Sequence, residues 1–83
     1  MATEQEIKQG IISNTGGIYR VWYVGLTDDP DKAKKDAGSS AKNWKTWKAD
    51  SDAVAAGIIK FFTGAGVKQV PGTGSTVFIY MKR

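Results

Sequence analysis

Isoleucines at helical spacing mark the first predicted element of the chain. Their positions are Ile7, Ile11 and Ile12, which share one face of a helix. Thr3 and Glu6 have the spacing of a capping box, in which each side chain satisfies a backbone amide of the first turn. Residues 14–17, Asn-Thr-Gly-Gly, have the composition of a turn. The pattern therefore predicts a helix that starts near Thr3 and ends at this turn.

Stretches of β-branched and aromatic residues predict strands. From Ile18 to Gly25 only Arg20 interrupts the apolar run, so we expect a central strand with both faces covered. A second strand is expected from Asn43 to Ala49, and a third from Thr76 to Met81. The apolar side chains of the third alternate between two faces, with Val77, Ile79 and Met81 on one and Phe78 and Tyr80 on the other.

A short exposed helix is expected directly after the first strand. Asp29 can cap it, Pro30 suits its first position and Gly38 can end it. Opposite charges at i,i+4 spacing are typical of a solvent-facing helix. The charge pairs here are Asp31 with Lys35 and Lys32 with Asp36. Helix capping also accounts for the aspartates around Pro30 without the Mg²⁺ that such carboxylates can hold.

The longest helix is predicted at about residues 52–63, capped by Asp50 or Ser51 and closed by Gly64. Gly57 lies in its middle at a cost of about 1 kcal/mol relative to alanine, which indicates close packing against the sheet. The expected buried face consists of Ala53, Val54, Gly57, Ile58, Phe61 and Phe62. The Gly-rich residues 64–75 that follow form either an anion-binding loop or a helix cap and a connection.

These elements predict a single α/β (α+β) domain over residues 1–83. The expected order is α-β-α-β-α-β, with a small three-stranded sheet packed against the helices. The chain has 83 residues, of which 41% are hydrophobic, enough for one core. No internal repeat divides it.

The chain contains neither cysteine nor histidine, and this excludes several classes of chemistry. Zinc and similar metals have no ligand set, and Ser-His and Cys-His catalysis are ruled out. We therefore expect no cofactor, no metal site and no catalytic residues. The polar N-terminus is not a secretory signal, and no apolar stretch is long enough to span a bilayer, so we expect a cytoplasmic protein without a membrane partner.

Residues 32–48 form a lysine-rich segment with interleaved tryptophans. It holds six lysines and a single acidic residue, within a chain of net charge +4. Lysine neutralises phosphate and an exposed indole stacks on bases, so the segment is a candidate nucleic-acid surface. The candidate residues are Lys32, Lys35, Lys42, Trp44, Lys45, Trp47 and Lys48. The alternative is a solvated helix followed by a strand whose tryptophans belong to the core; on an ideal strand Trp44 and Trp47 point to opposite faces.

The segment Trp22-Tyr23-Val24-Gly25-Leu26-Thr27-Asp28-Asp29-Pro30 resembles the start of the GIY-YIG endonuclease domain. It is also similar to a set of small uncharacterised bacterial proteins with a Trp-Tyr-Val-Gly-Ile-Thr run. The resemblance extends to an Ala-rich helix ending in aromatics, a Gly-rich loop and a last strand. It implies that Tyr23, with Arg20 nearby, occupies the place of a catalytic tyrosine.

The chain departs from the nuclease pattern at two positions that carry the chemistry. The family's helical arginine is replaced by Ala33, and the metal-binding glutamate by Ile59. Without that glutamate a catalytic metal has no anchor. The Gly17-Ile18-Tyr19 triplet spells the first family motif, but it lies too close to Tyr23 to form the required hairpin. The resemblance therefore implies a catalytically degenerate domain.

Three functions remain open from the sequence. The first is a non-catalytic domain that binds DNA or RNA through the lysine and tryptophan residues. The second is a protein-interaction or self-associating module, which would use its aromatic side chains and an exposed edge strand at Thr76 to Met81. The third is residual nuclease activity centred on Tyr23 and Arg20.

Overall fold

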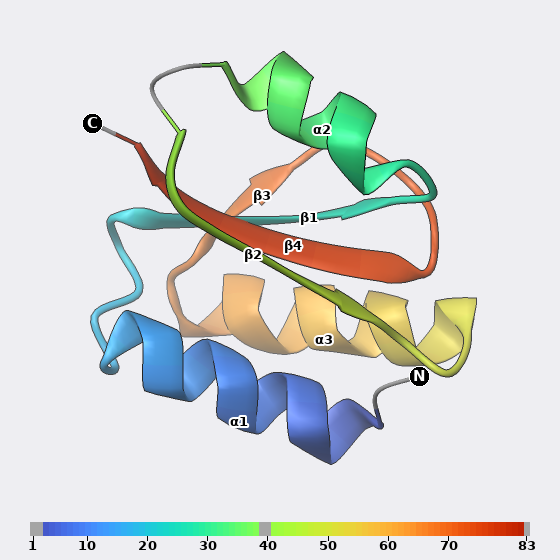
Figure 1. Ribbon diagram of the computed structural model, residues 1–83. Coiled ribbons are helices and arrows are strands. Elements are labelled where there is room, and N and C mark those ends of the chain that lie inside the picture. The colour runs from blue at the N-terminus through green and yellow to red at the C-terminus, as the bar shows by residue number, and fades with distance from the viewer. Residues whose placement is uncertain (1–2, 39–40, 83) are drawn as a thin grey trace.

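A computed structural model describes residues 3–38 and 41–82, the side chain of Lys82 excepted, and arranges them in three layers (Figure 1). A mixed four-stranded sheet lies in the middle, with α1 and α3 on one face and α2 on the other. The elements are α1 (Glu4–Thr15), β1 (Trp22–Thr27), α2 (Pro30–Ala37), β2 (Ala41–Lys48), α3 (Asp52–Ala65), β3 (Lys68–Val70) and β4 (Thr76–Lys82). The mixed α/β class expected from the sequence is confirmed.

The sheet has the strand order β2-β4-β1-β3. β4 is antiparallel to both β2 and β1, whereas β3 runs parallel to β1. The prediction of three strands is wrong, because β3 forms within the expected Gly-rich connection. Only three residues long and largely polar, β3 has no alternation of apolar side chains that a sequence pattern could reveal.

The placement of β4 at an exposed edge is also wrong. β4 pairs on both sides and lies in the interior of the sheet, so the edges are β2 and β3. The expectation that the strand around Tyr23 is central is confirmed, although β1 starts at Trp22 rather than Ile18. Ile18 and Val21 lie in the preceding connection and are exposed.

The core lies between the sheet and the two helices α1 and α3. Ile7 and Ile11 of α1 are fully buried there, whereas Ile12 is partly exposed. The sheet contributes alternate residues of its two central strands: Trp22, Val24, Val77 and Ile79. This alternation leaves the intervening residues of β1 and β4 on the opposite face, beneath α2.

The helix starts follow the predicted capping residues. The Thr3 hydroxyl accepts a hydrogen bond from the Glu6 amide at 3.2 Å, within a complete capping box. The Asp29 carboxylate accepts one from the Lys32 amide at 3.1 Å. Ser51, rather than Asp50, caps α3. These local bonds satisfy backbone amides that have no partner inside the helix.

The expected buried face of α3 is wrong in part. The buried residues are Ala55, Ile58, Ile59 and Phe62. Ala53 and Gly57 are exposed, and Phe61 is 47% exposed. Gly57 has no neighbour that an added methyl group would meet, so close packing does not explain this glycine. Small and apolar residues occupy nearly every position of α3, which makes its true face ambiguous from periodicity alone.

None of the helices in the two described ranges is long and apolar enough to cross a membrane.

Candidate functional site

Four aromatic rings gather on the face of the sheet that α2 partly covers. Tyr23 comes from β1, Trp44 from β2, and Phe78 and Tyr80 from β4. Tyr23 stacks on Tyr80 with ring centroids 5.3 Å apart, and Trp44 stacks on Phe78 at 4.8 Å and on Tyr80 at 5.7 Å. We call these four residues the aromatic face. Their mutual stacking gives this side of the sheet a second, smaller apolar layer.

A bulge in β2 places Trp44 on the aromatic face. Lys42 pairs with Met81 and Lys45 with Ile79, so two residues of β2 lie opposite Tyr80 alone. Asn43 occupies the bulge with a φ of 58°, and its side-chain amide donates to the Met81 sulfur at 3.3 Å. Asparagine tolerates this left-handed conformation better than most residues. Because side chains alternate, one extra residue changes the face on which every later side chain lies.

Trp47 lies on the other face, as the spacing from Trp44 predicted. It pairs with Val77 and packs against the core on the face of the sheet that α1 covers. Its indole lies so close to Gly10 of α1 that a methyl group there would be 2.8 Å from the ring. Both tryptophans are therefore half-buried and engaged in packing, on opposite sides of the sheet.

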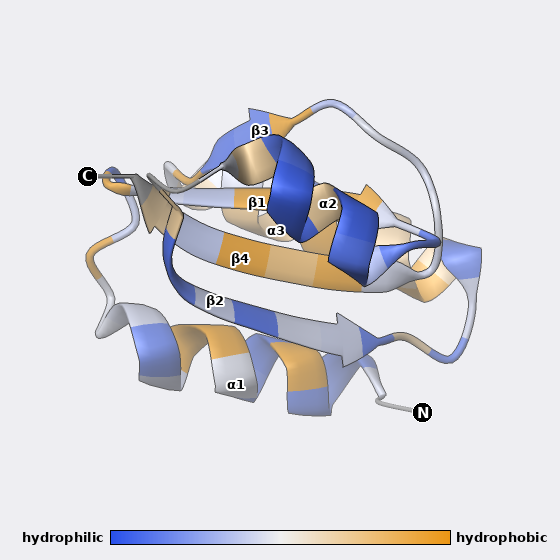
Figure 2. Cartoon of the chain, turned by 45° about the horizontal axis from the view of Figure 1, so that its top comes forward, coloured by the Kyte–Doolittle hydropathy of each residue, from blue (hydrophilic) through white to orange (hydrophobic). Residues whose placement is uncertain are grey.

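The six lysines of the basic segment are exposed on two neighbouring elements, α2 and the edge strand β2. Figure 2 shows the hydrophilic α2 and β2 beside the hydrophobic β4. Lys48 shares a side of β2 with Trp44, whereas Lys42 and Lys45 pair with core residues and lie on the other side. The β2 lysines thus project from both sides of one sheet edge rather than from a single face.

The net charge of the chain is concentrated in this segment. Residues 30–48 carry six lysines against Asp31 and Asp36, a balance of +4 that equals the charge of the whole chain. The remaining residues contain six basic and six acidic side chains. The expected ion pairs of α2 do not form: among the described residues the ion pair observed joins Glu4 to Lys8. Exposed i,i+4 pairs are weak, so the α2 charges stay solvated.

The polar side chains at the end of β1 and directly after it accept hydrogen bonds from backbone amides at the start of α2 and in the segment before β4. The Thr27 hydroxyl accepts from the Asp29 amide at 3.0 Å, and the Asp28 carboxylate accepts from the Ser75 amide at 3.3 Å. With Asp29 capping α2, these side chains have structural roles. Within residues 3–38 and 41–82, no three acidic side chains come together in a way that could hold a metal ion.

The Gly-rich connection packs tightly against the end of β1. A methyl group on Gly72 would lie 2.5 Å from the Leu26 carbonyl oxygen, and one on Gly74 would lie 2.3 Å from the Thr27 carbonyl carbon. Gly74 also has a positive φ of 141°. These glycines are thus required by a close approach of two backbone segments.

The positions implied by the nuclease resemblance do not converge. Tyr23 lies on the aromatic face, where the Lys68 ammonium is 5.6 Å from its ring centroid. Ala33 lines a cavity on that same side, and Arg20 is exposed in the turn before β1. Ile59 is buried in the core on the opposite side of the sheet. A glutamate at that position would point into the core, away from Tyr23.

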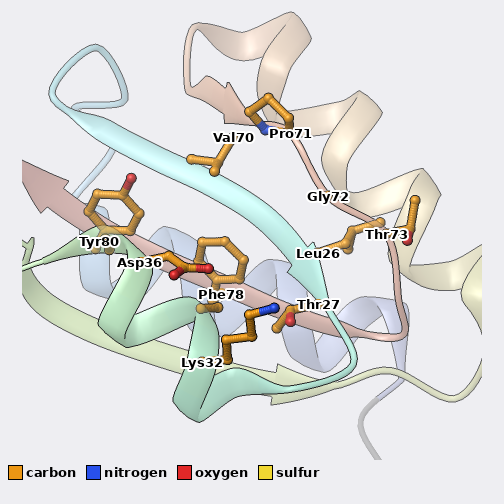
Figure 3. A pocket seen from close by; sticks show the side chains of 12 residues that line it. Leu26, Thr27, Lys32, Asp36, Val70, Pro71, Gly72, Thr73, Phe78 and Tyr80 are labelled. Carbon is orange, nitrogen blue, oxygen red and sulfur yellow. The ribbon is translucent and has the colours of Figure 1, made fainter.

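A cavity of about 280 Å³ opens between α2 and the connection from β3 to β4 (Figure 3). Phe78 and Tyr80 line it from the sheet, and Lys32 and Asp36 line it from α2. The sequence did not indicate this cavity, because it depends on β3 bringing residues 70–73 beside α2. One feature of the sequence could have pointed to the cavity. Lys32 and Asp36 are spaced i,i+4 on α2, beside the small residues Ala33 and Ala37, and all four line it.

Tyr80 is the most perturbed titratable group of the site. Burial, and to a lesser extent the neighbouring Tyr23, raise the pKa of its phenol above the ordinary value of 10.0. Both causes disfavour the phenolate. At neutral pH Tyr80 is therefore a hydrogen-bonding hydroxyl within the site.

No protein-family model matches the chain, and no curated protein or solved structure matches it either.

Proposed function

We propose that this chain is a non-catalytic binding domain that holds the phosphates of nucleic acid with the lysines of α2 and β2. The observation that carries the proposal is the concentration of the entire net charge in residues 30–48. Such a patch attracts polyanions from a distance and gains affinity by releasing their counterions.

The local structure also suits backbone binding. Lys42, Lys45 and Lys48 lie on an eight-residue edge strand with no acidic residue among them. None of them is held in an ion pair with a described residue. Their ammonium groups can therefore reach phosphates without first breaking an internal contact. Because lysine is a point charge, we expect little dependence on sequence.

The roles of the tryptophans change in this proposal. Trp47 packs against α1, and Trp44 is stacked on Phe78 and Tyr80. To stack on a base, Trp47 would have to leave its contact with α1, whereas Trp44 already has Phe78 and Tyr80 as stacking partners. The lysines, rather than the indoles, are thus expected to supply most of the affinity.

The test is fluorescence anisotropy with labelled single- and double-stranded oligonucleotides over a series of salt concentrations. Replacing Lys42, Lys45 and Lys48 by glutamine should weaken binding strongly. For duplex DNA it should lower the slope of log affinity against log salt by up to about 2.7, at about 0.9 per lost phosphate contact. The matched control replaces Lys8, Lys60 and Lys68, which removes the same charge elsewhere.

Equal losses in the two triple variants would mean that net charge alone, without a defined surface, explains binding. An affinity that is independent of salt would contradict the proposal directly.

The self-association hypothesis loses its main support, because β4 is interior. The free edge β2 carries three lysines, and such charges oppose pairing with another strand. The nuclease hypothesis receives no support from the placement of Ile59.

A further inference from the structure

The cavity beside α2 combines apolar walls with polar groups at its rim. Phe78 is 4% exposed and contributes its ring from the sheet, while Val70 and Pro71 form the opposite wall. Its volume of about 280 Å³ is just below the usual range for ligand pockets, which begins near 300 Å³. A cavity of this size suits one small ring system.

Tyr80 supplies an uncommitted hydrogen-bonding group to this cavity. The residue is only 6% exposed and lines the cavity. No buried side-chain polar atom of the described residues lacks a hydrogen-bond partner, so the Tyr80 hydroxyl, for which no such bond is observed, is an accessible group. Its pKa is raised, so it remains a hydroxyl that can donate or accept.

Lys32 and Asp36 lie one helical turn apart and both reach the cavity from α2 (Figure 3). They form no ion pair with each other. The carboxylate accepts hydrogen bonds only, so it requires a ligand with N–H donors. The ammonium at the other end requires an anionic or carbonyl group.

We propose that this cavity binds one nucleobase that carries an exocyclic amine. The base lies against the Phe78 and Tyr80 rings, its amine donates to Asp36, and the Tyr80 hydroxyl bonds a ring nitrogen or carbonyl. Lys32 then meets the attached phosphate. Cytosine, adenine and guanine offer such an amine. In uracil the available N–H lies between two carbonyl oxygens, which a carboxylate repels.

This inference rests on the proposed function, since α2 also carries part of the basic surface. It adds a base-reading site to a backbone-binding one. An unpaired nucleotide could place its base in the cavity while the flanking phosphates meet the lysines, as in single-strand recognition.

The test is an amide chemical-shift titration with nucleoside monophosphates at high salt, which weakens the phosphate contacts of exposed lysines, Lys32 included, and leaves the contacts of the base to be measured. We expect shifts at Leu26, Gly72 and Thr73 with CMP, AMP or GMP, and at least tenfold weaker binding of UMP. Trp44 emission gives a second signal, because its indole stacks on both cavity aromatics.

Substitutions separate the groups that the proposal names. Asp36→Ala should weaken CMP binding about tenfold or more, as for the loss of a charged hydrogen bond, whereas Asp31→Ala, on the same helix, should not. Tyr80→Phe removes only the hydroxyl and should cost about threefold to tenfold. UMP binding as tightly as CMP, or equal affinities in the Asp36 and Asp31 variants, would overturn the assignment.

Oligonucleotides distinguish this inference from the proposed function. If single strands with abasic sites bind as well as intact ones, the lysines act alone and the base pocket is refuted. If oligonucleotides fail to bind while CMP shifts the cavity residues, the pocket stands and the phosphate-binding function is wrong.

Discussion

Gly25 is the glycine of the Tyr-Val-Gly segment, and adding one methyl group there should destabilise the protein. A Cβ at this position would lie 2.4 Å from Phe78 Cζ and 2.9 Å from Cε2. Carbon atoms in contact prefer a separation of about 3.5–4.0 Å. The Phe78 ring would therefore have to move by roughly 1 Å or more to restore that separation.

The surroundings resist this movement. Phe78 is buried and stacks on Trp44, so displacing its ring disturbs the aromatic face. Overpacking of this kind costs about 1–3 kcal/mol. Gly25 does not have a positive φ, so alanine can adopt its backbone conformation. Alanine has less conformational entropy than glycine in the unfolded chain, and this offsets the cost by about 0.4–1 kcal/mol. The net expectation for Gly25→Ala is a loss of about 1–2 kcal/mol.

The assay is urea unfolding followed by tryptophan fluorescence, with the midpoint as readout. A loss of this size should also lower Tm by about 4–16 °C for a domain of this length. Gly57→Ala is the control, because it lies on the exposed face of α3 with open space around it. It should stabilise the protein by up to about 1 kcal/mol.

A double variant tests the cause. Gly25→Ala combined with Phe78→Leu should be more stable than the sum of the single effects predicts, since the smaller side chain makes room for the methyl group. If Gly25→Ala is as stable as the parent, or the two effects simply add, Phe78 does not impose the glycine.

Two further predictions concern the bulge and the buried phenol. Asn43→Val should cost about 1–2 kcal/mol, because a β-branched residue resists the left-handed conformation, whereas Asn43→Gly should be close to neutral. Near-UV circular dichroism of stacked Trp44 would report the change, and a fully stable valine variant would exclude a left-handed residue there. Above pH 10 the unfolded chain ionises its tyrosine before folded Tyr80 does, so stability should fall as pH rises toward the raised folded pKa. Tyr80→Phe should show a smaller loss over that range in unfolding experiments at a series of alkaline pH values, and an unchanged loss would show that Tyr80 is not the group responsible.

Local signals in the sequence predicted the local structure well. Thr3, Asp29 and Pro30 mark helix starts because each acts on backbone groups within three residues. The alternation in β4 correctly placed Val77 and Ile79 on one face of the sheet and Phe78 and Tyr80 on the other, since successive side chains of a strand point to opposite faces.

Features that depend on tertiary contacts escaped prediction. β3 has no strand pattern of its own and exists because β1 offers it a partner. The order of the strands, and hence the interior position of β4, is decided by long-range pairing. The bulge at Asn43 follows from the register between β2 and β4, which no local rule specifies. The cavity is lined by residues 70–73, which β3 positions, and by Phe78 and Tyr80 of the interior strand β4, so it escaped prediction for the same reason.

The interior position of β4 has a consequence for how the chain folds. β4 comes after all other described elements in the sequence, yet it joins β2 to β1. Until β4 has been synthesised and has paired, β2 has no neighbour in the sheet. Phe78 and Tyr80, the two β4 residues of the aromatic face, are then also missing. Such non-local pairing slows folding, because distant segments must meet before stabilising contacts form. We therefore expect the transition state for folding to require the last strand, and fragments that lack it to expose apolar surface that invites aggregation.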